Sequence, residues 1–596
     1  MREYTTPGAV DLIETDHLVQ PIIAHAQQRP DAPLLAYRDG DRFVDVTCIQ
    51  VWERVRGLAK GLIALGVEPG DRVALMSSTR IEWVLLDYAI LAAGAVTVPI
   101  YETSSAEQVE WILSDSEAVA AVFESDALRA ESYDPIADGV PTEHVLVLDA
   151  GAEDELHAKA ADIDDAVLDE RLSKLTIDDM ATLIYTSGTT GRPKGCVLTH
   201  GNLRWDAVQS LKVIQELVQE GDSQLLFLPL AHVFAKILTL SSIETGAKVG
   251  FATSIDKLQE ELPIFQPTFL AAVPRVFEKV LAGAQQKAAA DGKGAIFDKA
   301  ADVAIQYSRE QQEGGAGFGT KMKHTVFDKL VYGKVRAAFG GRLRAAVSGG
   351  GPLGERLAHF FNGVGVQIYE GYGLTETSPV LTCNSPALWR IGSVGKPIPG
   401  TTIRIADDNE ILAKGGQIFQ GYYNNEEATR EAVDEDGWFH TGDLGSLDDD
   451  GFLRITGRKK EIIVTAAGKN VAPAPLEDRV QSHRLVSQAM VIGDNRKFIS
   501  CLVTIDEEAF PTWAEEHGKS GKSVADLTDD DELRAEIQRA IDHANKAVSH
   551  AEAIKKFVIL PEDFTVETGE LTPTMKVKRR VVEDKYDATI DSIYAG

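Results

Sequence analysis

A stretch rich in glycine and hydroxyl residues, YTSGTTGRPKG at 185–195, is the first part of the sequence that indicates chemistry. Glycines let a backbone turn with positive φ and approach a ligand closely, hydroxyls donate hydrogen bonds, and a lysine adds a point charge. The strand-like segment ATLIY leads into the stretch at 181–185. These features together predict a loop that binds phosphate.

Three other kinds of site fit the sequence less well. The stretch is not a Walker A loop, because that pattern has different spacing and places a hydroxyl residue directly after its lysine. GKSGKS at 518–523 also fails the pattern, since Glu516 stands where the first glycine should be, and we interpret it as an exposed loop. Ser348 does not lie in a GxSxG elbow, because position 346 is Ala346, which argues against a serine hydrolase.

Six motifs in order resemble the adenylate-forming superfamily, which includes acyl-CoA synthetases, luciferases and the adenylation domains of peptide synthetases. After YTSGTTGRPKG come VSGGGPL (347–353), YEGYGLTET (369–377), HTGDLG (440–445), GRKKEII (457–463) and LTPTMKVKRR (571–580). The resemblance covers nearly the whole chain. It implies that ATP and Mg²⁺ activate a carboxylate as an acyl adenylate.

The resemblance implies a division of labour around the phosphates of ATP. The site must neutralise the triphosphate while a carboxylate attacks the α-phosphorus in line. The residues implied to hold the β- and γ-phosphates are Thr186, Ser187, Gly188, Thr189, Thr190, Gly191 and Lys194. Thr189 and Glu376 are implied to hold Mg²⁺, a hard cation that prefers oxygen ligands. Turn capping is the alternative interpretation for Ser187 or Thr190.

The nucleoside half of ATP is implied to lie against three further motifs. Tyr372 would stack on the adenine, Thr375 would reach the α-phosphate, and Asp443 would accept hydrogen bonds from the ribose hydroxyls with Arg458 beside it. The glycines implied to let backbone pass close to the nucleotide are Gly349, Gly350, Gly351 and Gly373. Gly351 stands where many relatives have alanine, which we expect to matter little.

The catalytic set implied by the resemblance is Lys576, Glu376 and Thr375. Lys576 corresponds to the C-terminal lysine of the family, which bridges the substrate carboxylate and the α-phosphate. Loss of one preorganised charge donor typically costs about 10²–10³ in rate. For the neighbouring Lys578, Arg579 and Arg580 we favour a solvated basic run.

Transfer to a thiol requires Lys576 and its domain to leave the approach to the adenylate. Relatives rotate the small domain about a hinge, for which Lys460 is the candidate here. The residues implied to line the tunnel for CoA are Ala466, Ala467, Gly468 and Lys469. The pair Ala466–Ala467 departs from the usual Ser-Gly or Gly, which leaves open how the thiol approaches.

The acyl group is expected to lie along FLPLAHVFAKILTLSSIETGA at 227–247, with His232 and Phe234 at the channel. His232 fits a buried core histidine as an alternative. The insert between VPRVFEK (273–279) and VSGGG resembles the long-chain fatty acid CoA ligases. Each buried methylene contributes about 0.8 kcal/mol, so a palmitoyl-length tail would supply roughly 10 kcal/mol before ordering costs.

Our interpretation is therefore a long-chain fatty acid CoA ligase that uses ATP, Mg²⁺ and CoA. A close alternative is a fatty acyl-AMP ligase that passes the acyl group to a carrier protein. A noncatalytic acyl-nucleotide sensor is disfavoured because Lys576 and Glu376 are both present. A luciferase-like oxygenase shares the adenylation motifs, and only the absence of light emission or oxygen uptake would exclude it.

The elements that must position these residues begin with a βαβαβ pattern after Arg72: RVALM, a helix to Gly94, AVTVPIY, a helix from Ser105, then AVAAVF. The pattern continues around 144–149 and 223–234 and predicts an α/β class with a parallel or mixed sheet covered by helices. At 596 residues the chain exceeds one ordinary core.

Changes of composition suggest where the domains divide. We expect a large N-terminal α/β domain over 1–457, with an inserted helical element at about 282–340 that is rich in Ala, Lys, Gln and Gly. A small mobile α+β domain over 458–596 should follow, with a hairpin across VIGDNRKFISCLVTID. It would carry Lys576 to the site.

Composition limits the partners. The chain has 60 Lys+Arg against 91 Asp+Glu, a net charge of −31, which opposes nonspecific attraction to nucleic acid or anionic lipid. The four cysteines are far apart and the longest apolar run is interrupted by Asp87, Gly94 and Pro99. We expect no metal-cysteine site, signal peptide or membrane span, and a cytoplasmic location. Fatty acids are concentrated in membranes, so transient peripheral contact of the protein with a membrane fits this substrate.

Overall fold

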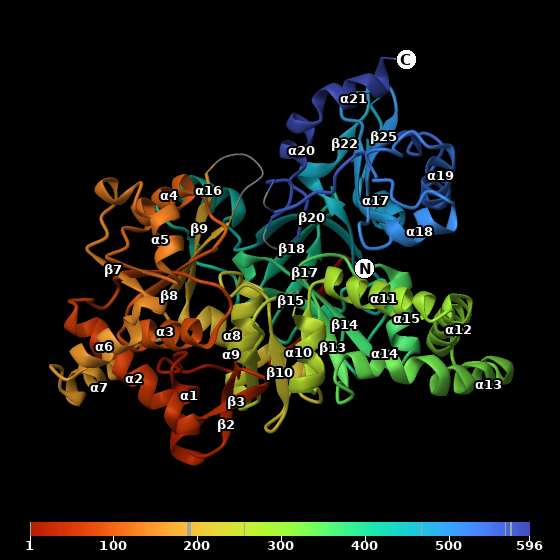
Figure 1. Ribbon diagram of the computed structural model, residues 1–596. Helices are drawn as coiled ribbons and strands as arrows, with labels where there is room; N and C mark the ends of the chain where they lie inside the picture. Colours follow the sequence, from red (N-terminus) through yellow and green to blue (C-terminus); the bar gives the residue numbers. More distant parts are fainter. Residues whose placement is uncertain are drawn as a thin grey trace.

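The computed structural model describes residues 2–186, 192–255, 257–466, 468–566, 568–572 and 575–595. It consists of a large N-terminal part, built from three sheets and their helices, and a smaller C-terminal part above it in Figure 1. This α/β arrangement confirms the fold class predicted from the sequence. None of the helices in the described ranges is long and apolar enough to cross a membrane.

A seven-stranded mixed sheet carries the start of the candidate site. Its order is β19 (Gly421–Tyr422), β9 (Lys194–Thr199), β8 (Met180–Thr186), β5 (Val96–Ile100), β4 (Arg72–Met76), β6 (Ala120–Phe123) and β7 (His144–Val147). The predicted βαβαβ unit is confirmed, because β4 pairs in parallel with both β5 and β6. Its helices are α3 (Ile81–Ala92) and α4 (Ala106–Ser116).

A nine-stranded sheet forms the middle of the molecule. Its order is β16 (Lys396–Pro397), β15 (Val380–Cys383), β14 (Gln367–Gly373), β13 (Ala345–Ser348), β12 (Phe269–Ala272), β10 (Ser223–Leu226), β11 (Lys248–Phe251), β2 (Pro33–Asp39) and β3 (Arg42–Thr47). The alternation of strands and helices was expected to continue over 223–234, and the strand there ends at Leu226. Helix α9 (Val233–Thr245) begins soon after, with the His232 side chain capping its first turn.

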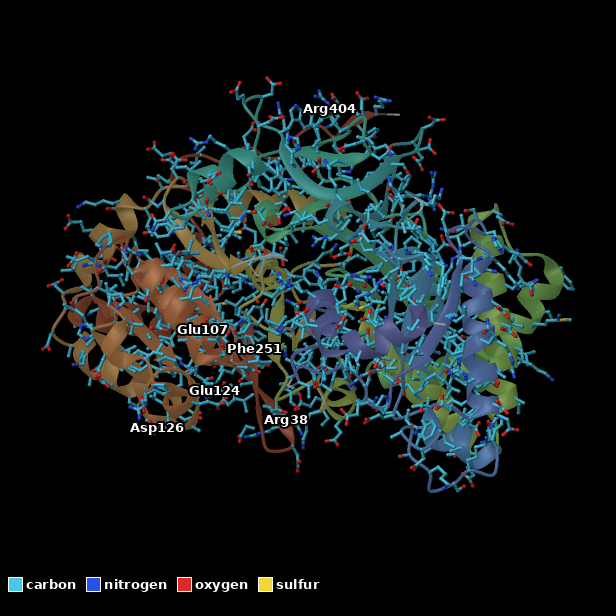
Figure 2. All side chains as sticks on the ribbon, turned by 90° about the horizontal axis from the view of Figure 1, so that it is seen from above. Arg38, Glu107, Glu124, Asp126, Phe251 and Arg404 are labelled. Atoms are coloured by element: carbon cyan, nitrogen blue, oxygen red, sulfur yellow. The ribbon has the colours of Figure 1, made fainter. Side chains whose placement is uncertain are left out.

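A five-stranded antiparallel sheet completes the N-terminal part. Its order is β1 (Glu3–Thr5), β17 (Thr402–Ile405), β18 (Glu410–Lys414), β20 (Phe439–Leu447) and β21 (Leu453–Arg458). Figure 2, seen from above, separates this sheet from the seven-stranded one, because Arg404 of β17 and Asp126 beside β6 lie on opposite sides of the molecule. Phe251 of β11, which belongs to the nine-stranded sheet, is labelled between Arg404 and Asp126 in the same view.

The remaining N-terminal helices cover these sheets. They are α1 (Gln20–Gln28), α2 (Cys48–Ala64), α5 (Asp126–Ser132), α6 (Ala152–Ala160), α7 (Asp165–Lys174), α8 (His200–Ile214), α10 (Leu258–Phe265), α15 (Glu355–Gly363) and α16 (Glu426–Ala432). Short 3₁₀ turns add Ala137–Gly139, Leu148–Ala150, Thr375–Thr377 and Lys459–Glu461. One continuous buried cluster packs the first two sheets against helices such as α3 and α9.

The inserted segment is helical. It contains α11 (Pro274–Ala290), α12 (Gly294–Gln312), α13 (Phe318–Phe327), a π-helical turn (Asp328–Tyr332) and α14 (Gly333–Ala338). The first helix therefore begins eight residues before the expected 282, because Pro274 suits the first turn of a helix. Figure 1 places α13 at the outer edge of the molecule.

The C-terminal part has a core of its own. A ribbon of β22 (Ile463–Val464) and β23 (Asn470–Val471) precedes a sheet of β24 (Val486–Ile492), β25 (Ile499–Ile505) and β26 (Ile554–Ile559). The predicted hairpin is confirmed, since β24 and β25 pair antiparallel. The helices are α17 (Ala474–Gln481), α18 (Phe510–Glu516), α19 (Asp531–Asn545), α20 (Arg579–Lys585) and α21 (Asp587–Tyr594).

Candidate active site

Tyr372, Asp443 and Arg458 come from three strands and form one hydrogen-bonded group. The Tyr372 hydroxyl donates to Oδ2 of Asp443 at 2.6 Å, and Nε of Arg458 donates to Oδ1 at 2.7 Å. The second contact follows from strand register, because Asp443 of β20 pairs with Arg458 of β21. Asp443 is only 4% exposed, so its charge is balanced by these two donors rather than by water.

Lys576 of the C-terminal part reaches this group. Desolvation lowers the pKa of its amine, the Arg458 charge lowers it further, and the carboxylates of Asp443 and Glu461 act in the opposite direction. The side chain keeps contact with solvent, although protein atoms surround the amine closely enough to desolvate it. Its backbone is held by a turn, in which the Thr572 amide donates to the Lys576 carbonyl at 2.8 Å.

His232 lies near enough to the same amine for its charge to act on the imidazole. Burial lowers the pKa of the imidazole to about 3, and the positive charge of Lys576 acts in the same direction. Nδ1 accepts a hydrogen bond from the Phe234 amide at 3.1 Å. A neutral ring that accepts at Nδ1 carries its proton on Nε2, so His232 offers an N–H donor near Lys576.

The glycine-rich loop after β13 touches the predicted acyl-channel residue. A Cβ on Gly349 would lie 3.1 Å from the ring of Phe234, and Gly350 has φ +79°. A side chain at either position would therefore press on the aromatic ring or strain the backbone. Gly351 has more room, because the nearest atoms to an added Cβ belong to Pro274 at 3.8 Å. The loop thus joins the predicted nucleotide and acyl regions.

Gly373 is required by close backbone contact. A Cβ there would lie 1.6 Å from the carbonyl oxygen of Pro379, the residue just before β15. This contact holds the end of β14 against the start of β15, at a register shift between Tyr372 and Gly373. Thr375 and Glu376 follow directly in a 3₁₀ turn, so the hairpin fixes where both side chains begin.

Glu376 and Lys194 meet at Tyr422, a residue that the sequence motifs do not include. The Tyr422 hydroxyl donates to Oε1 of Glu376 at 2.8 Å, and the Lys194 ammonium lies 4.9 Å from the centre of the Tyr422 ring. Burial and the Glu376 charge raise the pKa of Tyr422, which keeps the hydroxyl a donor. Thr186 pairs with Lys194 across β8 and β9.

The rest of the phosphate loop lies outside the described residues. This applies to Ser187, Gly188, Thr189, Thr190 and Gly191, whose roles stay predictions. The strands on both sides are described, and they place Thr186 and Lys194 opposite one another at the base of the loop.

The predicted hinge and CoA residues lie elsewhere in this arrangement. Lys460 is exposed in the 3₁₀ turn between β21 and β22. Ala466, Gly468 and Lys469 form the tip of the β22–β23 ribbon, where the Ala466 amide donates to the Arg496 carbonyl and Lys469 pairs with Glu552 at 3.1 Å. Ala467 is outside the described residues. These partners all belong to the C-terminal part, so the structure does not bring this ribbon to Lys576.

The sequence also gave no sign of the polar contacts between the two parts. Arg275 of α11 donates to Ser487 at 3.2 Å and to Asp506 at 3.4 Å. Two buried carboxyl groups have raised pKa values: burial raises the pKa of Glu370 on β14 to about 8 and that of Asp478 on α17 to about 7, and the Asp478 charge adds to the first shift. Glu370 lies in YEGYGLTET and Arg275 in VPRVFEK, but neither stretch indicated these contacts, because they join distant segments.

Comparison with known sequences gives two family matches. Residues 23–423 match the AMP-binding enzyme family, and residues 460–596 match the AMP-binding enzyme C-terminal domain. The long-chain-fatty-acid–CoA ligase FadD15 of Mycobacterium tuberculosis is 51% identical over 599 residues, covering 100% of both chains. The long-chain-fatty-acid–CoA ligase ACSBG2 of Xenopus laevis is 34% identical over 95% of this chain and 82% of its own.

Comparison with solved structures gives the same fold. The adenylation domain of a carboxylate reductase from Mycobacterium chelonae has a TM-score of 0.76 at 23% identity, covering 97% of this chain and 91% of its own. An anthranilate CoA ligase in complex with anthranoyl-AMP has a TM-score of 0.73 at 20% identity, covering 96% of this chain and 97% of its own.

Proposed function

Since this chain belongs to the family of AMP-binding enzymes, we propose that it is an ATP-dependent long-chain fatty acid–CoA ligase. It converts a fatty acid and ATP to an acyl adenylate and pyrophosphate, then transfers the acyl group to CoA and releases AMP. The observation that carries this proposal is the position of Lys576 beside Asp443, Arg458 and His232. Asp443, Arg458 and Lys576 belong to three of the adenylation motifs, whereas His232 was expected at the acyl channel.

The nucleoside of ATP is proposed to bind at Tyr372, Asp443 and Arg458. Asp443 has two carboxylate oxygens, each already within reach of one donor, and a carboxylate oxygen accepts more than one hydrogen bond. The ribose hydroxyls can therefore join this group without displacing it. Gly349, Gly350 and Gly351 leave backbone uncovered on the side of Phe234 and Pro274, which supports a close approach of the adenine.

The triphosphate is proposed to bind along Thr186–Gly191 and Lys194, with Thr375 at the α-phosphate. Glu376, together with Thr189, would hold Mg²⁺. The fit of Glu376 rests on its carboxylate, which accepts a hydrogen bond from Tyr422 at Oε1 and has a second oxygen of the kind that Mg²⁺ prefers. The ion supplies charge neutralisation at the phosphates.

Lys576 is proposed to act in the first reaction. A carboxylate oxygen of the fatty acid forms a bond to the α-phosphorus while the bond to pyrophosphate breaks, and two anions must come together for this to happen. The Lys576 ammonium lies where it can neutralise both, and the Nε2 proton of neutral His232 can donate to the incoming carboxylate. Preorganised donors of this kind stabilise the transition state without reorganisation of solvent.

The second reaction is proposed to need a different placement of the C-terminal domain, 458–596, relative to the N-terminal domain, 1–457. In the present arrangement Lys576 occupies the site, and the ribbon with Ala466–Lys469 is bonded elsewhere. Rotation about Lys460 would move Lys576 away from the site and bring the ribbon with Ala466–Lys469 to it. The pantetheine of CoA could then enter. The contacts of Arg275 with Ser487 and Asp506 would break in that step.

The acyl chain is proposed to lie along α9 beyond His232 and Phe234. The helix is apolar and almost wholly buried, which suits a hydrocarbon tail. The long-chain name of the relatives supports the same chain length. Because the substrates partition into lipid, we propose that the enzyme works in the cytoplasm with transient contact to a membrane.

The test measures the two reactions separately, in wild type, Lys576→Ala and the neighbouring control Lys578→Ala. Pyrophosphate release from palmitate and ATP reports the first reaction, and palmitoyl-CoA formed from synthetic palmitoyl-AMP reports the second. We expect Lys576→Ala to lose about 10²–10³ in the first rate only, and Lys578→Ala to retain both. Pyrophosphate release without acyl-CoA formation in wild type would instead identify a ligase that serves a carrier protein.

A further inference from the structure

The outer side of α13 carries a stripe of large apolar side chains that face solvent. Phe318 is 84% exposed, Met322 60%, Val326 52% and Leu330 56%. They follow one another at intervals of four residues, so they lie along one side of α13 and its π-helical continuation. The stripe is about 18 Å long at 1.5 Å per residue. Exposure of this kind at successive positions marks a surface that binds something apolar.

The opposite side of the same segment accounts for its folding. Thr320 is 9% exposed, while Tyr332 and Val335 are buried, and the Tyr332 hydroxyl donates to the Ala300 carbonyl of α12 at 2.7 Å. The ring of His324 stacks on Tyr307 of α12 at 3.9 Å. The segment is therefore anchored to α12 by one side, which leaves the side chains of the apolar stripe more than half exposed.

The segment is basic in an acidic protein. Residues 318–344 contain seven Lys and Arg and one Asp, in a chain whose net charge is −31. Lys321, Lys323, Lys329 and Lys334 are exposed, and none of them forms an ion pair with another described residue. Lys321 and Lys329 each lie three residues after a member of the stripe, hence beside it on the helix surface.

A cavity adds a place for an anion next to the stripe. It has a volume of about 390 Å³, and its lining includes Lys329, Arg336 and His324 together with Asp328. Arg336 pairs with Asp328 at 2.7 Å, so one guanidinium is partly neutralised, whereas Lys329 keeps its full charge. A phosphate group that entered here would meet two cationic side chains, and an acyl chain attached to it would extend over the stripe.

We propose that α13 and its π-helical continuation form a docking surface for an anionic phospholipid bilayer. Phe318, Met322, Val326 and Leu330 insert at the boundary between headgroups and acyl chains, and the exposed lysines contact lipid phosphates. This combination of an apolar side and flanking lysines is that of helices that lie in the membrane interface. The proposal rests on the proposed function in one respect: the docking surface would bring the enzyme to a fatty acid dissolved in the membrane.

The distribution of charge explains why such a surface must be local. The chain as a whole is repelled by an anionic membrane, because its net charge is −31. Figures 1 and 2 both place the green helices of the insert at the outer edge of the molecule. A basic segment at the edge can approach lipid within a Debye length, about 10 Å at 0.1 M salt, while most of the acidic surface stays farther away. The result is one preferred orientation.

The first experiment is cosedimentation of the whole protein with lipid vesicles. One set contains equal parts of phosphatidylglycerol and phosphatidylcholine, and the other contains phosphatidylcholine alone. We expect binding to the anionic vesicles that weakens with added salt, and at least tenfold weaker binding to the neutral ones. Equal binding to both sets, or no binding to the anionic set at low salt, would overturn the proposal.

Two pairs of variants locate the surface. A basic residue near an anionic surface contributes roughly a fivefold change in affinity, so Lys321→Gln with Lys329→Gln should weaken vesicle binding about 25-fold. Lys212→Gln with Lys522→Gln removes the same charge from exposed positions elsewhere and should leave binding near wild type. If both pairs of variants lose vesicle binding equally, the loss comes from the net charge of the protein, which would contradict the docking surface.

The apolar stripe is tested in the same way. Met322→Ser with Val326→Ser should abolish measurable vesicle binding, while Ile13→Ser with Leu388→Ser, which replaces apolar residues that are 66% and 52% exposed elsewhere, should not. Turnover of a dissolved medium-chain acid without vesicles should stay unchanged in all four variants, which separates this test from the proposed function. If the α13 variants instead abolish a dimer seen by analytical ultracentrifugation and leave vesicle binding intact, the surface binds a second copy and the membrane proposal is wrong.

Discussion

The Tyr422 hydroxyl donates a hydrogen bond to Oε1 of Glu376 at 2.8 Å, and the Lys194 ammonium lies 4.9 Å from the centre of the same ring. Tyr422 belongs to β19, which pairs with β9 at the edge of the seven-stranded sheet. One aromatic side chain therefore connects the proposed magnesium ligand with the lysine of the phosphate loop. A carboxylate held by a donor is oriented before its ion arrives.

Replacement of Tyr422 by phenylalanine should impair the use of magnesium. Loss of a partner that orients a metal ligand typically costs about 10- to 100-fold in metal affinity or activity. We expect Tyr422→Phe to raise the Mg²⁺ concentration for half-maximal pyrophosphate release about tenfold, while palmitoyl-AMP is still converted to palmitoyl-CoA. The control is Tyr423→Phe at the next position. Unchanged magnesium dependence in Tyr422→Phe would refute this role.

Loss of Arg275 should slow adenylate formation and should not slow transfer of the acyl group to CoA. Its guanidinium links α11 to Ser487 and Asp506 of the C-terminal part, so it stabilises the arrangement in which Lys576 lies at the site. Hydrogen bonds to charged groups contribute about 1.5–3 kcal/mol, and Arg275→Ala should slow pyrophosphate release about tenfold or more.

The matched control for Arg275 lies on the same helix. Lys279 of α11 is exposed, and Lys279→Ala should leave both reactions unaffected. Conversion of palmitoyl-AMP should be unchanged or faster in Arg275→Ala, because the closed arrangement is less favoured. If the two reactions slow equally, Arg275 stabilises the fold of α11 rather than the contact between the domains.

Glu370 should make thermal stability fall as the pH rises. Burial raises the pKa of this carboxyl to about 8 from its ordinary value of 4.5, and the Asp478 charge contributes to the shift. The folded protein therefore keeps a proton that the unfolded chain releases above its own pKa. This stabilisation is complete below about pH 4.5 and is lost as the pH rises through about 8.

The variant Glu370→Gln removes this proton and keeps an acceptor for the Leu353 amide, which now donates to Oε1 at 3.0 Å. Melting temperatures of wild type and variant should be similar near pH 5 and diverge toward pH 8, with the variant more stable, since each pKa unit corresponds to about 1.4 kcal/mol. Glu131→Gln, at an exposed position, is the control. Parallel melting curves across this range would contradict the prediction.

Breaking the buried ion pair between Lys236 and Asp87 should lower the free energy of unfolding much more than breaking an exposed pair. The Lys236 ammonium lies 2.7 Å from both oxygens of Asp87, and the two side chains are 2% and 4% exposed. Lys236→Met leaves a buried carboxylate without its partner, which typically costs about 3–5 kcal/mol. Lys248→Met breaks the pair with Asp45, which is 2.8 Å long and partly exposed, and should cost less than about 1 kcal/mol.

Thermal unfolding followed by circular dichroism measures both losses. The double variant Asp87→Asn with Lys236→Met should recover part of the stability, because it removes the unpaired charge. If Lys236→Met melts within about 2 °C of wild type, the pair is not a closed ion pair in solution, since 1 kcal/mol shifts the melting temperature of a large domain by roughly that amount.

The local elements followed from the sequence wherever side-chain pattern and backbone agree. The βαβαβ unit from β4 to β6 and the β24–β25 hairpin were predicted, because apolar runs of strand length alternate with capped helices. The alternation expected to continue around 223–234 is present as β10, which ends at Leu226, and α9, which begins at Val233. Pro229 and the capping side chain of His232 end the strand and begin α9, which an apolar pattern alone does not reveal.

The motifs named Tyr372, Asp443, Arg458 and Lys576 by chemical type and order along the chain. That they meet follows from strand register and from the placement of the C-terminal part, as with Asp443 and Arg458 on neighbouring strands. Tyr422 and Asp478 lie outside the quoted motifs, and the stretches that contain Glu370 and Arg275 did not indicate their contacts. Their partners are 46 residues away for Tyr422 and 231 for Arg275 with Asp506.

The sequence by itself determined the secondary structure of most segments, the chemistry of the side chains and the family that they indicate, because these depend on neighbours along the chain. Only the tertiary structure decided which distant residues share a hydrogen bond, a buried charge or an exposed face. The apolar stripe of α13 is one such case, since apolar residues at every fourth position of a helix are typical of a face that packs on a core. The packing of α12 against the other side leaves them in solvent.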